Sequence, residues 1–132
     1  MVNTTSTTYL FDKVSGQKKL QRERDRIAMV KRIYRTLIDM SDIISFKDAL
    51  LFGTIIKPFR FFKESDVDIG FYGLRDDDYF KAMAYLSNCL NRDVDIIQLE
   101  GHKLCDKIAK EGMRWKRQKS VSSNLKWKLK FE

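Results

Sequence analysis

The sequence predicts a small α/β (α+β) domain in which helices pack on one face of a mixed sheet. Two observations support this expectation. Three short apolar runs of strand length occur at residues 47–52, 66–72 and 93–99. Segments with helical periodicity precede, separate and follow these runs. Strands that alternate with helices are typical of a sheet that buries one face against those helices.

Length and composition agree with one domain. The chain has 132 residues and is 43% hydrophobic, enough for a real core. It contains no apolar run of about 18 residues and no visible signal peptide, so we expect no membrane span and a cytoplasmic location. Cys89 and Cys105 fall in two different predicted helices and His102 is the one histidine. This excludes the usual Cys/His zinc site and favours a reducing compartment.

The net charge of +8 is unevenly distributed. Residues 18–35 contain eight basic and two acidic residues, and residues 113–132 contain seven basic and one acidic residue. Residues 36–112 contain ten basic and fourteen acidic residues. Basic ends suit nucleic acid, nucleotide phosphates or an acidic protein, and the alternative is a solvated helix face.

The N-terminal third divides into an arm and a helix. Residues 1–16 are predicted to form a polar arm, loose or adding a short strand, that closes at Gly16. Residues 17–40 are predicted to form a helix that packs on the sheet and ends at Ser41-Asp42, with its charged front at 18–26 exposed. Its apolar stripe consists of Ile27, Val30, Tyr34 and Leu37.

The first strand, residues 47–52, leads into a turn at Gly53-Thr54. Because Pro58 interrupts helices, residues 55–62 are predicted to form a short helix or an irregular turn. Three aromatic residues in this segment need cover. We expect them in the core, with contact to a partner as the alternative; they are Phe59, Phe61 and Phe62.

The rest of the domain continues this alternation. The strand at 66–72 is followed by a turn at 73–78, a helix from Tyr79 to about Asn91, the strand at 93–99, and a helix between Gly101 and Gly112. The domain is predicted to span residues 17–119. In the tail, residues 120–132, apolar and lysine residues alternate, which predicts a half-buried strand that covers a sheet edge or pairs with another chain.

Asp66 and Asp68 are the candidate chemical centre. Side chains alternate along a strand, so both carboxylates point to one face while Val67 points into the core. Adjacent carboxylates repel each other, and a divalent cation removes that repulsion. Asp95 on the third strand adds another carboxylate at the strand spacing of about 4.8 Å. An isolated pair of this kind is often a solvated strand face or turn.

Gly53 and Thr54 supply the second half of the candidate site. A glycine at a strand end lets backbone N–H groups approach phosphate oxygens, and the Thr54 hydroxyl adds a donor. Since Mg²⁺ binds few carboxylates and keeps positions for phosphates, the whole arrangement suits two-metal phosphoryl or nucleotidyl transfer.

Four segments together resemble the minimal nucleotidyltransferases of the DNA polymerase β-like superfamily, over residues 41–112. They are Leu51-Phe52-Gly53-Thr54, Ser65-Asp66-Val67-Asp68-Ile69, Asp93-Val94-Asp95-Ile96-Ile97 and Lys110-Glu111-Gly112. The resemblance implies a palm-like fold with two Mg²⁺ ions and ATP as substrate. It implies that Asp66 and Asp68 bind both ions, and that Asp95 completes one metal site and helps to deprotonate the attacking hydroxyl.

The resemblance implies that Gly53 and Thr54 hold the triphosphate. Lys57 and Ser65 complete the predicted nucleotide-binding set. Thr54 replaces the family's usual serine and keeps the hydroxyl. The family's Arg-x-x-Gly-like stretch is replaced here by Ile55-Ile56-Lys57-Pro58. Lys57 or Arg60 would have to supply the missing phosphate contact.

Small prokaryotic members of this family often act as antitoxins. They transfer AMP from ATP to a tyrosine of a helical ribonuclease toxin of the higher-eukaryote-and-prokaryote nucleotide-binding family, and the resemblance implies this role here. Three alternatives remain open: neutralisation of a partner by occlusion alone, transfer to a small molecule such as an aminoglycoside, and, ranked last, nucleic-acid binding through the basic ends. The sequence leaves the acceptor, the preferred nucleotide and a homo-oligomer undecided.

Overall fold

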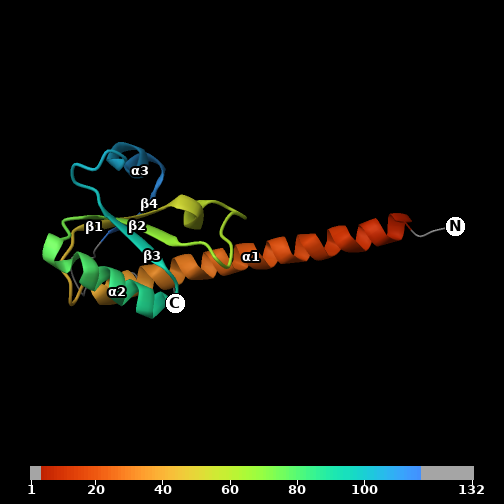
Figure 1. Cartoon of the computed structure of the whole chain (residues 1–132), viewed down its shortest axis with the longest axis horizontal. Coiled ribbons are helices and arrows are strands. Elements are labelled where there is room, and N and C mark those ends of the chain that lie inside the picture. Colours follow the sequence, from red (N-terminus) through yellow and green to blue (C-terminus); the bar gives the residue numbers. More distant parts are fainter. Residues whose placement is uncertain (1–3, 117–132) are drawn as a thin grey trace, which may run out of the picture.

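The computed structural model describes the backbone of residues 4–116 and the side chains of residues 9–116, and it confirms the predicted α+β class (Figure 1). The predicted tail strand at 120–132 lies outside the described residues. The elements in chain order are α1 (Thr4–Met40), β1 (Asp48–Phe52), the 3₁₀ turn η1 (Gly53–Ile56), β2 (Val67–Tyr72), η2 (Asp76–Asp78), α2 (Tyr79–Leu90), β3 (Val94–Gln98), α3 (Cys105–Glu111) and β4 (Met113–Lys116).

The four strands form one mixed sheet in the order β3-β2-β1-β4. β1 is antiparallel to both β2 and β4, whereas β2 and β3 are parallel and are joined through α2. Three strands were predicted within one or two residues of their ends. β4 was not, because four residues that follow directly on a helix are too few to show a period of two.

One face of the sheet is closed by α1 and α2, which lie together below it in Figure 1. Val67, Ile69 and Phe71 of β2 point to this side and are fully buried. They pack in one core with residues of the two helices, among them Ile33, Leu37, Leu86 and Leu90. The alternation of side chains along β2 therefore selects an entirely apolar set for this face.

The opposite face carries the short helix α3, so two of the three helices share a face and the third lies across from them. Leu50, Leu99 and Ile108 form a small second core beneath α3. Gly70 lies against Leu99 so closely that a Cβ there would come within 2.8 Å of a Leu99 methyl carbon. α3 thus covers part of this face, while other positions on it keep access to solvent.

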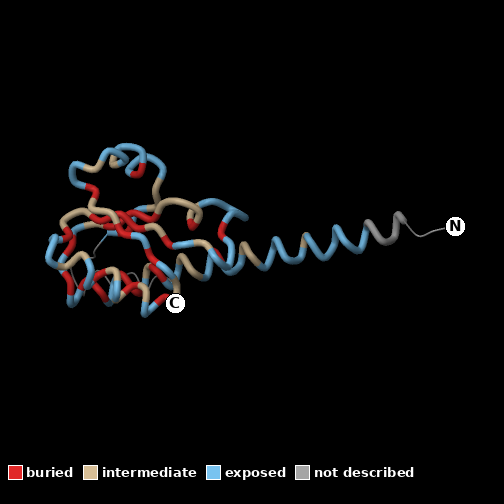
Figure 2. The backbone as a smooth tube through the Cα atoms, viewed as in Figure 1, coloured by how far each residue is buried: buried red, intermediate tan, exposed pale blue. Residues whose placement is uncertain are grey.

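Helix α1 begins at Thr4, so the expectation of a loose arm or a strand is wrong for residues 4–16. Its N-terminal part projects from the body and is almost entirely exposed (Figure 2). Gly16 does not end the helix, because one helical glycine costs only about 1 kcal/mol relative to alanine and each further residue adds a backbone hydrogen bond. Among the helices described, none has a stretch both long and apolar enough to cross a membrane.

Candidate functional site

Asp68 and Asp95 face each other across the parallel pair β2 and β3. The strand register aligns Asp68 with Asp95 on the face opposite the main core. Asp68 is half-buried and Asp95 is exposed. Burial, followed by the charges of Asp95 and Asp66 and a hydrogen bond with Asp95, raises the pKa of Asp68 to about 6. The fold therefore holds a carboxyl group in a place that disfavours its charged form.

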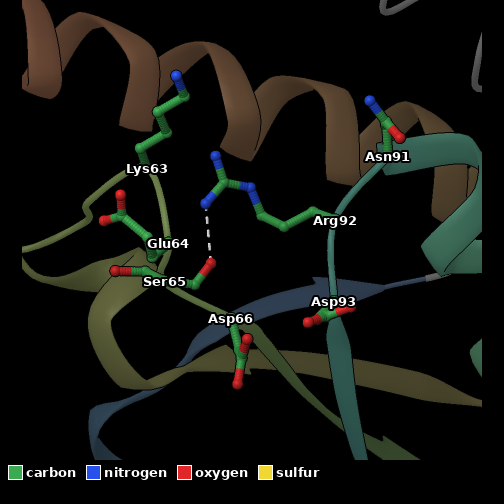
Figure 3. Close-up of a pocket in the computed structure, with 7 residues that line it drawn as sticks. All are labelled: Lys63, Glu64, Ser65, Asp66, Asn91, Arg92 and Asp93. Atoms are coloured by element: carbon green, nitrogen blue, oxygen red, sulfur yellow. Dashed lines mark hydrogen bonds between the residues drawn. The ribbon is translucent and has the colours of Figure 1, made fainter.

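Asp66 lies just before β2, two residues from Asp68, and is exposed. It lines an open hollow of about 470 Å³. The other lining residues are Lys63, Glu64, Ser65, Asn91, Arg92 and Asp93. Lys63 and Arg92 reach toward α1 on one side of the hollow, whereas Asp66 and Asp93 lie on the other (Figure 3). The two cations of the hollow thus lie across from Asp66 and Asp93, with Glu64 next to Lys63.

Gly53 brings backbone against the Asp68 carboxylate. Phe52 pairs with Asp68 in the antiparallel register of β1 and β2, and Gly53 follows at once. A Cβ on Gly53 would overlap the Asp68 carboxylate. Gly53 also has a φ of 76°, in the left-handed region that favours glycine. Both the backbone angle and the close approach therefore require glycine at the position that the sequence assigned to phosphate contact.

The donor set at this point suits a hard divalent cation. Within residues 4–116, no three His, Cys, Asp or Glu side chains are arranged as a ready-made metal site. The arrangement is instead a facing pair, Asp68 and Asp95, with Asp66 beside it. Mg²⁺ needs only one or two carboxylates, because waters and substrate phosphates complete its coordination. The residues present fit such an ion.

The other residues predicted to contact the nucleotide differ in exposure and in hydrogen bonding. Thr54 is half-buried in η1, and its carbonyl accepts a hydrogen bond from the N–H of Lys57 at 3.0 Å. The side chains of Lys57 and Arg60 are exposed. The Ser65 hydroxyl accepts a hydrogen bond from the N–H of Phe62 at 2.8 Å, so it shapes the loop between β1 and β2.

Glu23 and Arg26 of α1 anchor this loop. Arg26 binds Glu23 through two hydrogen bonds of 2.7 and 2.8 Å and donates a third, of 3.0 Å, to the carbonyl of Ile55. Glu23 also accepts the N–H of Phe59 at 2.9 Å. The hydrogen bond from Arg26, then that from Phe59, lowers the pKa of Glu23 to about 2. The two side chains thus connect α1 with both η1 and the middle of the loop.

The prediction that the charged front of α1 is exposed is wrong for Arg26, which is 9% exposed. Charged residues three apart on a helix are neighbours, so the Glu23–Arg26 pair could have been expected. Its partners at Ile55 and Phe59, about 30 residues further along the chain, follow only from the tertiary fold.

The three aromatic residues of the loop divide between core and surface. Phe61 is 3% exposed, which confirms the core prediction for that residue. Phe59 and Phe62 are 40% and 46% exposed, so the same prediction is wrong for them. The loop is held by its backbone: Glu23 accepts the N–H of Phe59, and Arg92 donates to the carbonyl of Phe62 at 3.0 Å. With the backbone held in this way, Phe61 is buried in the core while the other two rings stay exposed.

Comparison with known proteins gives a likeness in fold. No protein-family model and no curated protein matches the chain. A solved structure described as "Crystal structure of the toxin-antitoxin with AMP-PNP" aligns with a TM-score of 0.54 and 22% identity, over 64% of this chain and 74% of that chain. At this identity the likeness shows a shared fold.

Proposed function

We propose that this chain is a Mg²⁺-dependent nucleotidyltransferase that transfers AMP from ATP to a tyrosine hydroxyl of a partner toxin and acts as its antitoxin. The observation that carries the proposal is the facing pair Asp68 and Asp95, with the backbone of Gly53 against the Asp68 carboxylate. A pair of carboxylates on a solvent-accessible strand face adds no stability. The raised pKa of Asp68 means that its surroundings disfavour the charged form of this side chain. A cation and phosphate oxygens would reverse that penalty.

The similar solved structure supports the nucleotide and the toxin-antitoxin setting of this proposal. It is described as a toxin-antitoxin with AMP-PNP, so a protein of this fold has been crystallised in that setting. Two features of the present chain agree with it: a glycine-backed carboxylate site and the extended surface of α1 available for a protein partner.

In the proposed mechanism, Asp66 and Asp68 would hold Mg²⁺, and Asp95 would add a third carboxylate to that site. When bound, Mg²⁺ neutralises the carboxylates and the triphosphate. The N–H groups that follow Phe52 bind phosphate oxygens, which Gly53 permits because it has no side chain. The acceptor hydroxyl attacks the α-phosphorus of ATP, the bond from that phosphorus to pyrophosphate breaks, and Asp95 takes the hydroxyl proton.

The test is label transfer to the protein encoded in the neighbouring reading frame. We expect label from α-labelled ATP and none from γ-labelled ATP, because pyrophosphate leaves. The double variant Asp66→Asn with Asp68→Asn should lose at least about 100-fold in rate, since each residue holds the ion. Asp76→Asn with Asp77→Asn, two exposed carboxylates of η2, is the matched control. Equal labelling by both double variants would contradict the site assignment.

Neutralisation by occlusion is the second candidate function. It is favoured by the exposed positions of Lys57 and Arg60 and by the lack, within residues 4–116, of a three-carboxylate metal site. The same variants separate the two functions in cells that express the toxin. Under occlusion, Asp66→Asn with Asp68→Asn protects as well as the natural sequence does, whereas under nucleotidyl transfer protection is lost.

A further inference from the structure

We propose that the segment Lys57–Lys63 of the loop between β1 and β2 binds single-stranded nucleic acid. This binding does not depend on the proposed nucleotidyl transfer, although the candidate phosphate contacts Lys57 and Arg60 belong to the same segment. The segment, named here the basic–aromatic loop, has the sequence Lys-Pro-Phe-Arg-Phe-Phe-Lys and contains no acidic residue.

Charge and aromatic surface alternate along the basic–aromatic loop. Its three basic residues, Lys57, Arg60 and Lys63, recur at every third position and are all exposed. Phe59 directly precedes Arg60 and Phe62 directly precedes Lys63, and these two rings are 40% and 46% exposed. Each exposed ring therefore has a cation next to it along the chain.

The backbone that carries the exposed rings is held in place. Glu23 accepts the N–H of Phe59 at 2.9 Å, and the Ser65 hydroxyl accepts the N–H of Phe62 at 2.8 Å. Arg22 of α1 lies 4.3 Å from the centre of the Phe62 ring. Phe59 has a φ of 63°, which is rare for an aromatic residue and is retained here by contact with α1. Such a preformed surface loses little conformational entropy when a ligand binds.

A single strand matches this pattern better than a duplex does. Its bases are free to stack on aromatic rings while its phosphates meet lysine and arginine, and in a duplex the base faces are already stacked. Arg92 lies beside Lys63 on the side of the hollow that faces α1, and Glu64 follows Lys63 there (Figure 3). Glu23 does not oppose a polyanion there, because its charge is paired with Arg26 at 2.7 Å.

The experiment measures fluorescence anisotropy of the full chain with labelled oligouridine and oligothymidine. Both are about 20 nucleotides long, which exceeds the roughly 4–16 nucleotides that one small domain covers. The arms compare RNA with DNA, and a duplex of equal length is the third probe. The variants are Phe59→Ala with Phe62→Ala, and Lys57→Ala with Arg60→Ala and Lys63→Ala. Phe80→Ala, 77% exposed on α2, and the triple variant of exposed lysines Lys103, Lys107 and Lys110 are the matched controls.

We expect a single strand to bind more tightly than the duplex. The double phenylalanine variant should bind about 30-fold or more weakly, because each base stacked on an aromatic ring contributes at least about 1 kcal/mol. The triple basic variant should reduce the slope of log affinity against log salt by about 2, since each phosphate contact to a single strand contributes about 0.7. The controls should retain the natural affinity and slope.

Two results would overturn the proposal. One is equal binding by the loop variants and the controls, which would place the interaction on other basic residues. The other is absence of binding at low salt, which would leave the basic–aromatic loop as a contact for an acidic protein. Circular dichroism of each variant confirms that the fold is retained, as expected for substitutions of exposed side chains.

Discussion

The two faces of the sheet differ although the same strands build both. On the closed face, β2 contributes Val67, Ile69 and Phe71, all fully buried under α1 and α2. The opposite face is partly open to solvent and is called here the open face. On it, the residue between Val67 and Ile69 is Asp68, which lies opposite Asp95. The difference teaches that consecutive residues of one strand can be committed to stability and to chemistry in turn, because the strand period separates them.

The largest expected effect on stability compares two adjacent leucines of β1. Leu51 belongs to the main core and Leu50 to the small core under α3, and both are fully buried. Leu51→Ala should lower the free energy of unfolding by about 3–5 kcal/mol and Leu50→Ala by about 2–3 kcal/mol, because the smaller core can relax into the space. Chemical denaturation measures both, and a greater loss for Leu50→Ala would contradict the division into a main and a minor core.

The next effect concerns the contact between α1 and the loop beside the open face. Arg26→Met should lower the free energy of unfolding by about 2 kcal/mol, because Glu23 loses its partner and the carbonyl of Ile55 loses its donor. Arg24→Met, an exposed position on the same helix, should change it by less than about 0.5 kcal/mol. Equal values for the two variants would show that the anchor adds no stability.

A smaller effect should appear in the pH dependence of stability. The pKa of Asp68 rises from 3.8 to about 6 on folding, so the folded state binds more protons between these values and stability falls as pH rises through them. Asp68→Asn removes this penalty. Without added metal, the variant should therefore be more stable than the natural chain by about 1–2 kcal/mol at pH 7, and equally stable below pH 4.

Thermal unfolding at several pH values measures this difference, with Asp77→Asn on the exposed turn η2 as the control. Added Mg²⁺ should stabilise the natural chain and leave Asp68→Asn unchanged, because a ligand that binds only the folded state raises its stability. A natural chain that gains stability between pH 4 and pH 6 relative to Asp68→Asn would contradict the sign of the pKa shift.

The elements that could be predicted are those whose apolar residues recur at the spacing of a strand or a helix. The strands β1, β2 and β3 follow from short apolar runs, and α2 and α3 follow from helical spacing, since those patterns are local. The start of α1 was not predicted, because threonines and Gly16 are weak helix formers and the helix extends through them. Propensity alone does not decide where a long helix begins.

The same distinction applies to the candidate site. The strand register places Asp68 opposite Asp95, as the spacing of the carboxylates indicated, and Gly53 meets Asp68 at the end of β1. The anchor between Arg26 and the loop was missed, as was the exposure of Phe59 and Phe62. These features depend on contacts between segments far apart in sequence, which local patterns do not contain.

The most direct test of the central claim, that the open face is a metal-dependent nucleotide site, is calorimetric titration of AMP-PNP into the purified chain. The titration is repeated with excess Mg²⁺ and with a chelator. We predict saturable binding that requires Mg²⁺, is lost in Asp66→Asn with Asp68→Asn, and is kept in Asp76→Asn with Asp77→Asn. Binding of equal affinity in all three proteins, or binding that is indifferent to Mg²⁺, would contradict the account.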